Sequence, residues 1–212
     1  MASNSADLYW RWVLACTVGE IIGFVGLPVL AGAAVLALTG DFDPALRSII
    51  LYATSAVGGL GEGAVLALFQ LRVLRRHLTH LDGRRWVLYT ACAASFAWLC
   101  GMLAPLLDDL FGLTPATQIA IWLPASVLIL LSIGTAQSWV LRDVIKRPHR
   151  WIMANVTGWL LGLPWTFLLP ALLPDNAPMP VWLSTFLVAG VLMGLTVGLV
   201  TGRLVIKLQE LE

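Results

Sequence analysis

The sequence is poor in charged residues. Only 12% of its 212 residues are Asp, Glu, Lys or Arg, whereas a soluble domain carries about 25%. By contrast, 59% of the residues are hydrophobic, the mean hydropathy is +0.86, and apolar runs of about twenty residues recur along the chain. This shortage of charge argues against a water-soluble domain. It predicts a polytopic membrane protein whose main partner is the lipid bilayer and not nucleic acid.

Cysteine and histidine are scarce as well. The three cysteines, Cys16, Cys92 and Cys100, fall in apolar runs, and an odd number without a Cys-x-x-Cys motif makes a poor disulfide framework. We expect them to pack as small apolar side chains. No histidine lies inside an apolar run and no third ligand follows at metal spacing, so the sequence predicts neither a metal site nor a haem or pigment site. The histidines lie in basic loops, at His77, His80 and His149.

Signatures of catalysis and of cofactor binding are also missing. The apolar runs contain no nucleophile paired with a base and no nucleotide-binding loop. An intramembrane or lipid-modifying enzyme would need a nucleophile with a base, or a metal site. We therefore expect a protein without enzymatic activity and without a cofactor.

What the sequence does contain is six apolar segments bounded by charged or turn residues. Each is long enough to cross a hydrocarbon core of about 30 Å as a helix that rises about 1.5 Å per residue. The pattern predicts an all-α transmembrane fold, a six-helix bundle that forms a single membrane domain over residues 1–212. The predicted spans are 10–38, 48–71, 86–107, 117–140, 151–173 and 180–205.

Basic residues are distributed unevenly between the two sides of these spans. Of the 13 Lys and Arg residues, all except Arg47 lie at the N-terminus, in the loops after the second and fourth spans, or at the C-terminal end. By the positive-inside rule this side is cytoplasmic, which predicts a bacterial inner-membrane protein with both termini in the cytoplasm. The opposite side holds Arg47 and five aspartates: Asp41, Asp43, Asp108, Asp109 and Asp175.

Tryptophans mark many of the segment ends. Amphipathic indole rings prefer the membrane–water interface, where they form an aromatic belt. We expect most tryptophans to lie in this belt and the deeper Trp98, Trp159 and Trp165 to fill the core. The belt positions are Trp10, Trp12, Trp86, Trp139 and Trp151 on the cytoplasmic side, with Trp122 and Trp182 near the outer ends.

A repeated pattern divides the chain into three. An Arg-Trp pair opens each odd-numbered span, at Trp12, Trp86 and Trp151, and small residues follow seven and eleven positions later. Such a step lets helix backbones approach closely in lipid. Two even spans end alike, near Gln70 and Gln137, and the last more weakly near Thr201. We interpret the chain as three like-oriented helical hairpins with pseudo-threefold character, over approximately residues 9–80, 81–147 and 148–212. The glycines predicted to mediate packing are Gly19, Gly23, Gly158 and Gly162, and a ladder of Gly190, Gly194, Gly198 and Gly202.

Part of this pattern resembles a known group of proteins. The run AQSWVLR at residues 136–142 and the run WIMANVTGW at residues 151–159 resemble the repeated AQxWxVLR and WVxAxxxGW hairpins of uncharacterised bacterial multi-pass membrane proteins. The resemblance is strongest over residues 134–165. It implies a multi-pass bacterial membrane protein and no known activity.

Two acidic residues lie deep inside apolar runs, Glu20 in the first and Glu62 in the second. Their spacing from Arg11 and Arg72 puts both at roughly 13–15 Å from the basic boundary of antiparallel helices, close to the midplane. An ionised carboxylate there costs at least about 2.5–3.5 kcal/mol, so each should be protonated, paired or in a wet cavity. Facing each other, the two would share a proton. The pair is therefore a candidate proton or cation site.

Two other interpretations of the acidic pair stay open. Both groups could be protonated and hydrogen-bond across a helix interface or to a partner subunit, or the side chains could reach back toward the boundary. The repeat adds a constraint, because Ala94 and Trp159 replace Glu20 in the other hairpins. The positions equivalent to Glu62 are likewise apolar, Ile129 and Met193. The carboxylates are thus an addition to one hairpin of the repeated scaffold.

The loop after the second span is rich in arginine and is a candidate site for anionic lipid headgroups. The alternative, which we favour, is that these residues fix the topology. They are Arg72, Arg75, Arg76, Arg84 and Arg85.

Two functions follow from these features. The first expectation is a scaffold or accessory subunit of a membrane complex, associating with itself or with other membrane subunits, which would explain the glycine ladder and the short loops. The alternative is a small transporter or channel that uses Glu20 and Glu62, although the sequence shows no pair of broken helices of the kind found in many transporters.

Overall fold

The computed structural model of the protein describes residues 2–174 and 176–207, and the regular elements in these ranges are all helical. Six segments are long and apolar enough to cross a membrane, which confirms the all-α fold and the six spans. Asp175, one of the aspartates assigned to the outer side, lies outside the described residues. The six segments are Ser5–Leu38, Pro44–Leu74, Gly83–Phe111, Pro115–Leu141, His149–Leu172 and Met179–Val205.

Four of the spans are single helices, and the first and fifth are divided. Proline removes a backbone donor, and Pro164 and Pro170 open the two short elements that end the fifth span. The single helices are α3 (Pro44–Leu74), α4 (Gly83–Phe111), α5 (Pro115–Leu141) and α8 (Met179–Val205). The first span consists of α1 (Ala2–Glu20), the π-helix η1 (Ile21–Val29) and α2 (Leu30–Leu38). The fifth consists of α6 (His149–Gly162), α7 (Pro164–Leu168) and the 3₁₀ turn η2 (Pro170–Leu172).

Side-chain caps set where several helices begin. The Asp43 carboxylate accepts hydrogen bonds from the backbone amides of Ala45 and Leu46 at the start of α3, and Asp82 caps α4 in the same way. Such caps satisfy amide groups that have no partner in a first helical turn. α4 ends at Gly112, whose φ of 62° lies in the left-handed region that glycine adopts without strain.

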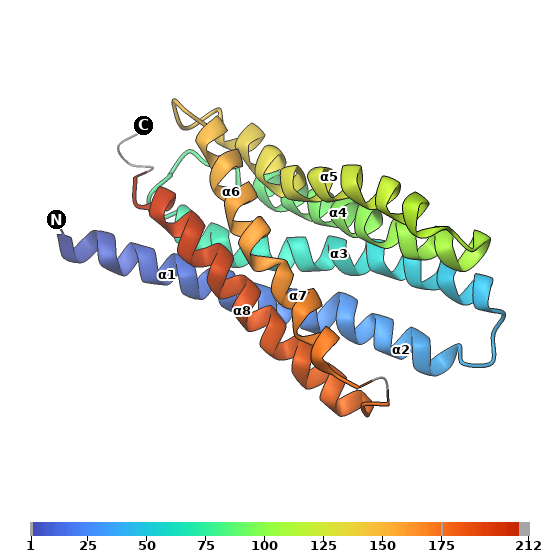
Figure 1. Cartoon of the computed structure of the whole chain (residues 1–212). Coiled ribbons are helices and arrows are strands. Elements are labelled where there is room, and N and C mark those ends of the chain that lie inside the picture. Colours follow the sequence, from blue (N-terminus) through green and yellow to red (C-terminus); the bar gives the residue numbers. More distant parts are fainter. Residues whose placement is uncertain (1, 175, 208–212) are drawn as a thin grey trace.

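The six spans form a closed ring. Each span packs against the spans that precede and follow it in the chain, and α8 packs against α1 and η1, so the last span closes on the first. The beginning of α1, the end of α8 and the loops that follow α3 and α5 lie at the same end of the bundle (Figure 1). These segments carry most of the basic residues, and we call this end the basic end.

The first span contains a π-helix where the sequence predicted an uninterrupted helix. Pro28 lacks an amide hydrogen, and in an α-helix its ring would collide with the carbonyl group four residues earlier. The backbone around it is widened into the nine-residue π-helix η1. π-helical geometry is rare and occurs frequently at functional sites. Glu20 is the last residue before η1, so this acid lies at the boundary between two helix types.

Three tryptophans predicted for the aromatic belt lie in the core, and that prediction is wrong for them. Trp12, Trp86 and Trp151 are 0% exposed, and the ring of Trp151 contacts the other two edge-on, with centroids 5.6 and 6.0 Å away. Trp10 and Trp139 are 59% and 54% exposed, as the belt requires. The reason is geometric: adjacent residues point about 100° apart on an α-helix, so a buried tryptophan can directly follow an exposed arginine.

Candidate functional site

Glu20 and Glu62 are brought together where the first, second and last spans meet. Two glycines allow the close approach. A Cβ atom at Gly23 would lie 3.0 Å from the backbone oxygen of Glu62, and one at Gly194 would lie 2.9 Å from the Cβ of Glu20. Because Gly194 belongs to α8, the acid pair is enclosed by helices from both ends of the chain.

Both acids are buried inside the protein. Glu20 is 0% exposed and Glu62 is 7% exposed. Side chains that reached back along their helices to the membrane boundary would be exposed there. The burial therefore excludes the interpretation in which the two side chains extend toward the basic end.

The two carboxyl groups differ in their partners. The indole Nε1 of Trp98, on α4, donates a hydrogen bond to Oε2 of Glu62 at 2.5 Å, and the missing side chain of Gly59 leaves room for this ring. The carboxyl groups of Glu20 and Glu62 are close enough to interact electrostatically. Neither oxygen of Glu20 receives a hydrogen bond from an amide, hydroxyl or ring N–H group within the described part of the chain. Its partner is the Glu62 carboxyl group, with which it can share a hydrogen bond when one of the two is protonated.

The chemistry that this pair supports is proton binding. Two adjacent negative charges in a low-dielectric interior repel each other, so the pair holds at least one proton. Divalent metals need more ligands: zinc takes about four and calcium about six to eight. Across residues 2–174 and 176–207, no group of three or more His, Cys, Asp or Glu side chains is placed to hold a metal ion. A proton or a monovalent cation fits the pair better.

A second polar cluster lies between the acid pair and the basic end, and Gln137 is its centre. Its Nε2 donates to Oε1 of Gln70 at 2.9 Å and to Oγ1 of Thr90 at 3.1 Å. Its Oε1 accepts from Nε1 of Trp151 at 2.8 Å. Gln70 also donates to Sγ of Cys16 at 3.7 Å, so the cluster joins five spans. Trp12, Trp86 and Thr201 adjoin these five residues. We call the whole set the glutamine–tryptophan layer: Trp12, Cys16, Gln70, Trp86, Thr90, Gln137, Trp151 and Thr201.

The tryptophans of this layer make similar contacts at different interfaces. Trp12 donates to Oγ1 of Thr201 at 2.8 Å, just as Trp151 donates to Gln137. In both cases the tryptophan opens an odd-numbered span and its acceptor lies near the end of the even span before it in the ring. The third tryptophan, Trp86, has a buried Nε1 without a hydrogen-bond partner among the residues that the structure describes. Two of three comparable interfaces therefore carry this hydrogen bond.

The glycines predicted to mediate packing all face other spans of the same chain. In α8, a Cβ atom at Gly198 would lie 2.9 Å from the Cα of Val13, and one at Gly190 would lie 3.2 Å from the ring of Phe24. The glycine ladder is therefore covered by the first span and is not available to another subunit. By the same measure, Gly19 and Gly23 face α3, Gly158 and Gly162 face α8, and Gly190, Gly194, Gly198 and Gly202 face α1 or η1.

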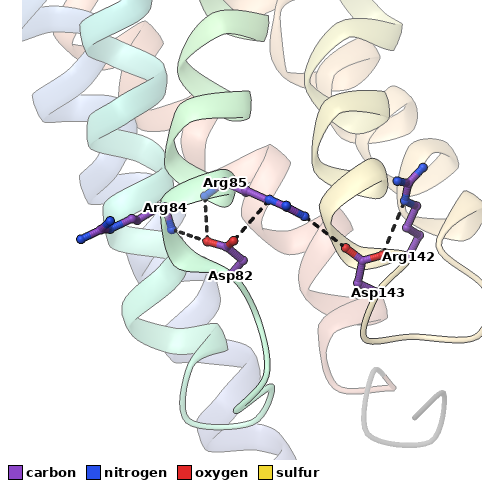
Figure 2. Close-up of polar contacts among 5 residues, drawn as sticks. All are labelled: Asp82, Arg84, Arg85, Arg142 and Asp143. Carbon is purple, nitrogen blue, oxygen red and sulfur yellow. Dashed lines mark hydrogen bonds and ion pairs between the residues drawn. The ribbon is translucent and has the colours of Figure 1, made fainter.

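The arginines at the basic end fall into two groups. Arg85 pairs with Asp82 at 3.3 Å and with Asp143 at 3.6 Å, and Arg142 also pairs with Asp143 (Figure 2). These exposed pairs tie the start of α4 to the loop after α5, and each contributes at most about 1 kcal/mol. Arg84 contacts Asp82 only through its backbone amide, and its side chain points away from the cluster in Figure 2.

Sequence reasoning missed several members of these clusters. Trp98 was expected only to fill the core, and it is partly buried and lies 36 positions from its partner Glu62. Thr90 and Cys16 were not recognised as layer residues. A signal for them was present, because each stands four residues after a repeated tryptophan and therefore on the same helical face.

A comparison of the chain with protein-family models, with curated proteins and with solved structures found no match.

Proposed function

We propose that this chain is a small proton-coupled transporter or channel of a bacterial inner membrane, with Glu20 and Glu62 as its proton-binding site. The observation that carries the proposal is the pair itself: two carboxyl groups, 0% and 7% exposed, that lie together inside the membrane spans. An ionisable residue inside a membrane is costly and rare, and it marks a candidate functional site.

Aromatic side chains on both sides of the acid pair support an occluded site. Toward the basic end lie the three fully buried tryptophans of the glutamine–tryptophan layer. Toward the other end, the ring of Phe24 lies 6.2 Å from that of Trp98 and 6.3 Å from that of Phe186. Alternating access opens a midplane site to one side at a time, and a site sealed on both sides corresponds to the state between the two openings.

The proposal includes an architecture of three like-oriented hairpins with pseudo-threefold character, over residues 9–80, 81–147 and 148–212. Contacts at matching repeat positions support it. A Cβ atom at Gly198 would lie 2.9 Å from the Cα of Val13, and one at Gly134 would lie 3.2 Å from the Cα of Ile152. Gly198 stands three residues before Thr201, and Gly134 stands three residues before Gln137. Their partners Val13 and Ile152 directly follow the repeated tryptophans Trp12 and Trp151.

The excess of basic residues at the basic end supports a cytoplasmic location of both termini.

Proton flux through proteoliposomes tests the proposed transport. Purified protein is reconstituted with a pH-sensitive dye inside the vesicles, and a pH gradient or a membrane potential is applied. We expect a flux that falls at least tenfold in Glu20→Gln and in Glu62→Gln. Asp143→Asn, which removes an exposed carboxyl group at the basic end, should retain the flux. Absence of flux in the wild-type protein, or an unchanged flux in the double Glu→Gln variant, would refute the proposal.

A scaffold or accessory subunit is the second candidate, and one observation favours it. α2 has no buried residue, and the Cβ position of Gly32 has nothing within 4 Å. This apolar segment is free to pack against another membrane subunit. Purification in mild detergent distinguishes the two functions: a partner that co-purifies in constant ratio supports the scaffold, and a chain that is always isolated alone counts against it.

A further inference from the structure

A groove runs along the outside of the ring between α3 and α4. It has a volume of about 600 Å³. Leu60 and Leu68 form part of one wall and Leu88 part of the other, and all three side chains are about half exposed. Ala64, also in the lining, leaves the floor open because its side chain is small. The groove therefore has apolar walls and opens toward the lipid.

The groove has the length of one lipid leaflet. Its lining on α3 extends from Leu60 to Arg75, which is about 22 Å at about 1.5 Å per residue. Half of a hydrocarbon core is about 15 Å thick, and the headgroup region lies beyond it. The end of the groove at Leu60 therefore lies near the midplane. The end at Arg75 lies at the depth of lipid phosphates.

Two arginines without an ion pair border the groove where it reaches the basic end. Arg75 packs over Gly83, and Arg84 follows directly on α4. Within residues 2–174 and 176–207, neither guanidinium group makes an ion pair. The nearby acid Asp82 is paired with Arg85 instead (Figure 2), which reduces its repulsion of an approaching anion. The groove thus combines apolar walls with two available positive charges at its rim.

A second hollow, between α1 and α3, is smaller, with a volume of about 250 Å³. Of the arginines at its rim, Arg11 is paired with Asp7 at 2.6 Å and Arg72 lies over the ring of Phe69 at 5.1 Å, while Arg76 makes no ion pair within residues 2–174 and 176–207. This hollow offers less room for an acyl chain than the groove between α3 and α4.

We propose that the groove between α3 and α4 binds one anionic phospholipid from the leaflet at the basic end. One acyl chain lies along Leu60, Ala64 and Leu68, and the phosphate is held by Arg75 and Arg84. Arginine suits this role because its planar fork binds phosphate through two parallel hydrogen bonds. The proposal is independent of proton transport at the acid pair.

Native mass spectrometry of the full chain released from vesicles of phosphatidylglycerol and phosphatidylcholine tests this site. We expect retention of one phosphatidylglycerol in preference to phosphatidylcholine. In Arg75→Gln/Arg84→Gln, retention should weaken about 30-fold, since each basic residue near an anionic surface contributes a factor of about five. The matched control is Arg85→Gln/Arg142→Gln, which removes the same charge from the ion-pair cluster and should change retention less than twofold.

A third variant separates the acyl chain from the headgroup. Ala64→Phe fills the groove and keeps both arginines, so it should also weaken lipid retention, and soluble glycerol phosphate should not compete with the lipid. Three results would each overturn the proposal: equal retention of the two lipids by the wild-type protein, equal losses in the two double-arginine variants, or full competition by glycerol phosphate.

Discussion

The acid pair and the glutamine–tryptophan layer are both polar and both buried in the ring, yet they differ in composition and in hydrogen bonding. Gln70 stands eight residues after Glu62, so about two helical turns separate the two regions. The layer draws on repeated positions of all three predicted hairpins, and Gln137 alone makes three hydrogen bonds in it. The acid pair belongs to one hairpin, and Glu20 has no hydrogen-bond partner among the described residues other than Glu62. The repeated polar residues thus form a connected network that holds the ring together, whereas the proposed transport rests on the unrepeated acids.

The largest effect on stability should come from removing a tryptophan of the layer. Trp151→Ala deletes a fully buried side chain, its two ring contacts and its hydrogen bond to Gln137. We expect a loss of about 3–5 kcal/mol, measured by unfolding of the purified protein in detergent. Trp139→Ala removes a half-exposed ring and should cost less than about 1 kcal/mol. Similar losses in the two variants would show that the layer does not stabilise the ring.

A smaller loss should follow when α8 is pushed away from the acid pair. The Cβ atom of Gly194→Ala would lie 2.9 Å from both the Cβ of Glu20 and the Cα of Thr17, so α1 and α8 must separate. Overpacking of this kind costs about 1–3 kcal/mol. Gly32→Ala is the control, because no atom outside its own helix turn lies within 4 Å of the new carbon. An unchanged free energy of unfolding in Gly194→Ala would mean that α1 and α8 pack less closely than the structure indicates.

The amides of the layer should contribute unequally. Gln137→Leu removes three hydrogen bonds, and Gln70→Leu removes one bond to Gln137 and one weak contact to sulfur. Hydrogen bonds between membrane helices contribute about 0.6 kcal/mol each on average. We therefore expect Gln137→Leu to cost about 2 kcal/mol and Gln70→Leu about half as much by the same unfolding assay. The reverse order would contradict the central place of Gln137.

The smallest effect on stability is expected where the effect on activity is largest. Glu20→Gln keeps the size of the side chain, removes a repelling acid and leaves an amide that can still hydrogen-bond to Glu62. Its free energy of unfolding should change by less than about 1 kcal/mol, while the proton flux is lost. A destabilisation above about 2 kcal/mol would instead assign Glu20 a structural role.

The sequence predicted the parts of this fold that depend on composition. The six spans follow from apolar length, since a membrane-crossing helix needs about twenty apolar residues. The spacing of Glu20 and Glu62 from basic residues predicted their similar depth, and the structure brings them together. No property of the isolated spans could show that Trp98 reaches Glu62, because that contact depends on how two hairpins pack.

Other errors came from side-chain direction and from backbone geometry. Trp12 was expected to face lipid because it lies at a membrane boundary, but its position along the helix says nothing about which face it occupies. Pro28 was visible in the first apolar run, yet a proline can be accommodated by a kink, a break or a widened turn. The choice of a π-helix depends on neighbours such as Gly58 on α3, where a Cβ atom would lie 2.7 Å from the Cα of Pro28.

The closure of the ring by α8 has a consequence for the order of assembly. Glu20 is made early in translation, and Gly194, which covers it, follows 174 positions later. Until α8 enters the membrane, one side of the first span is open, and a carboxyl group near the midplane must be carried there in its protonated form. The last span to be synthesised therefore shields an acid of the first span. The insertion of α8 is the step that converts a lipid-exposed carboxyl group into an enclosed one.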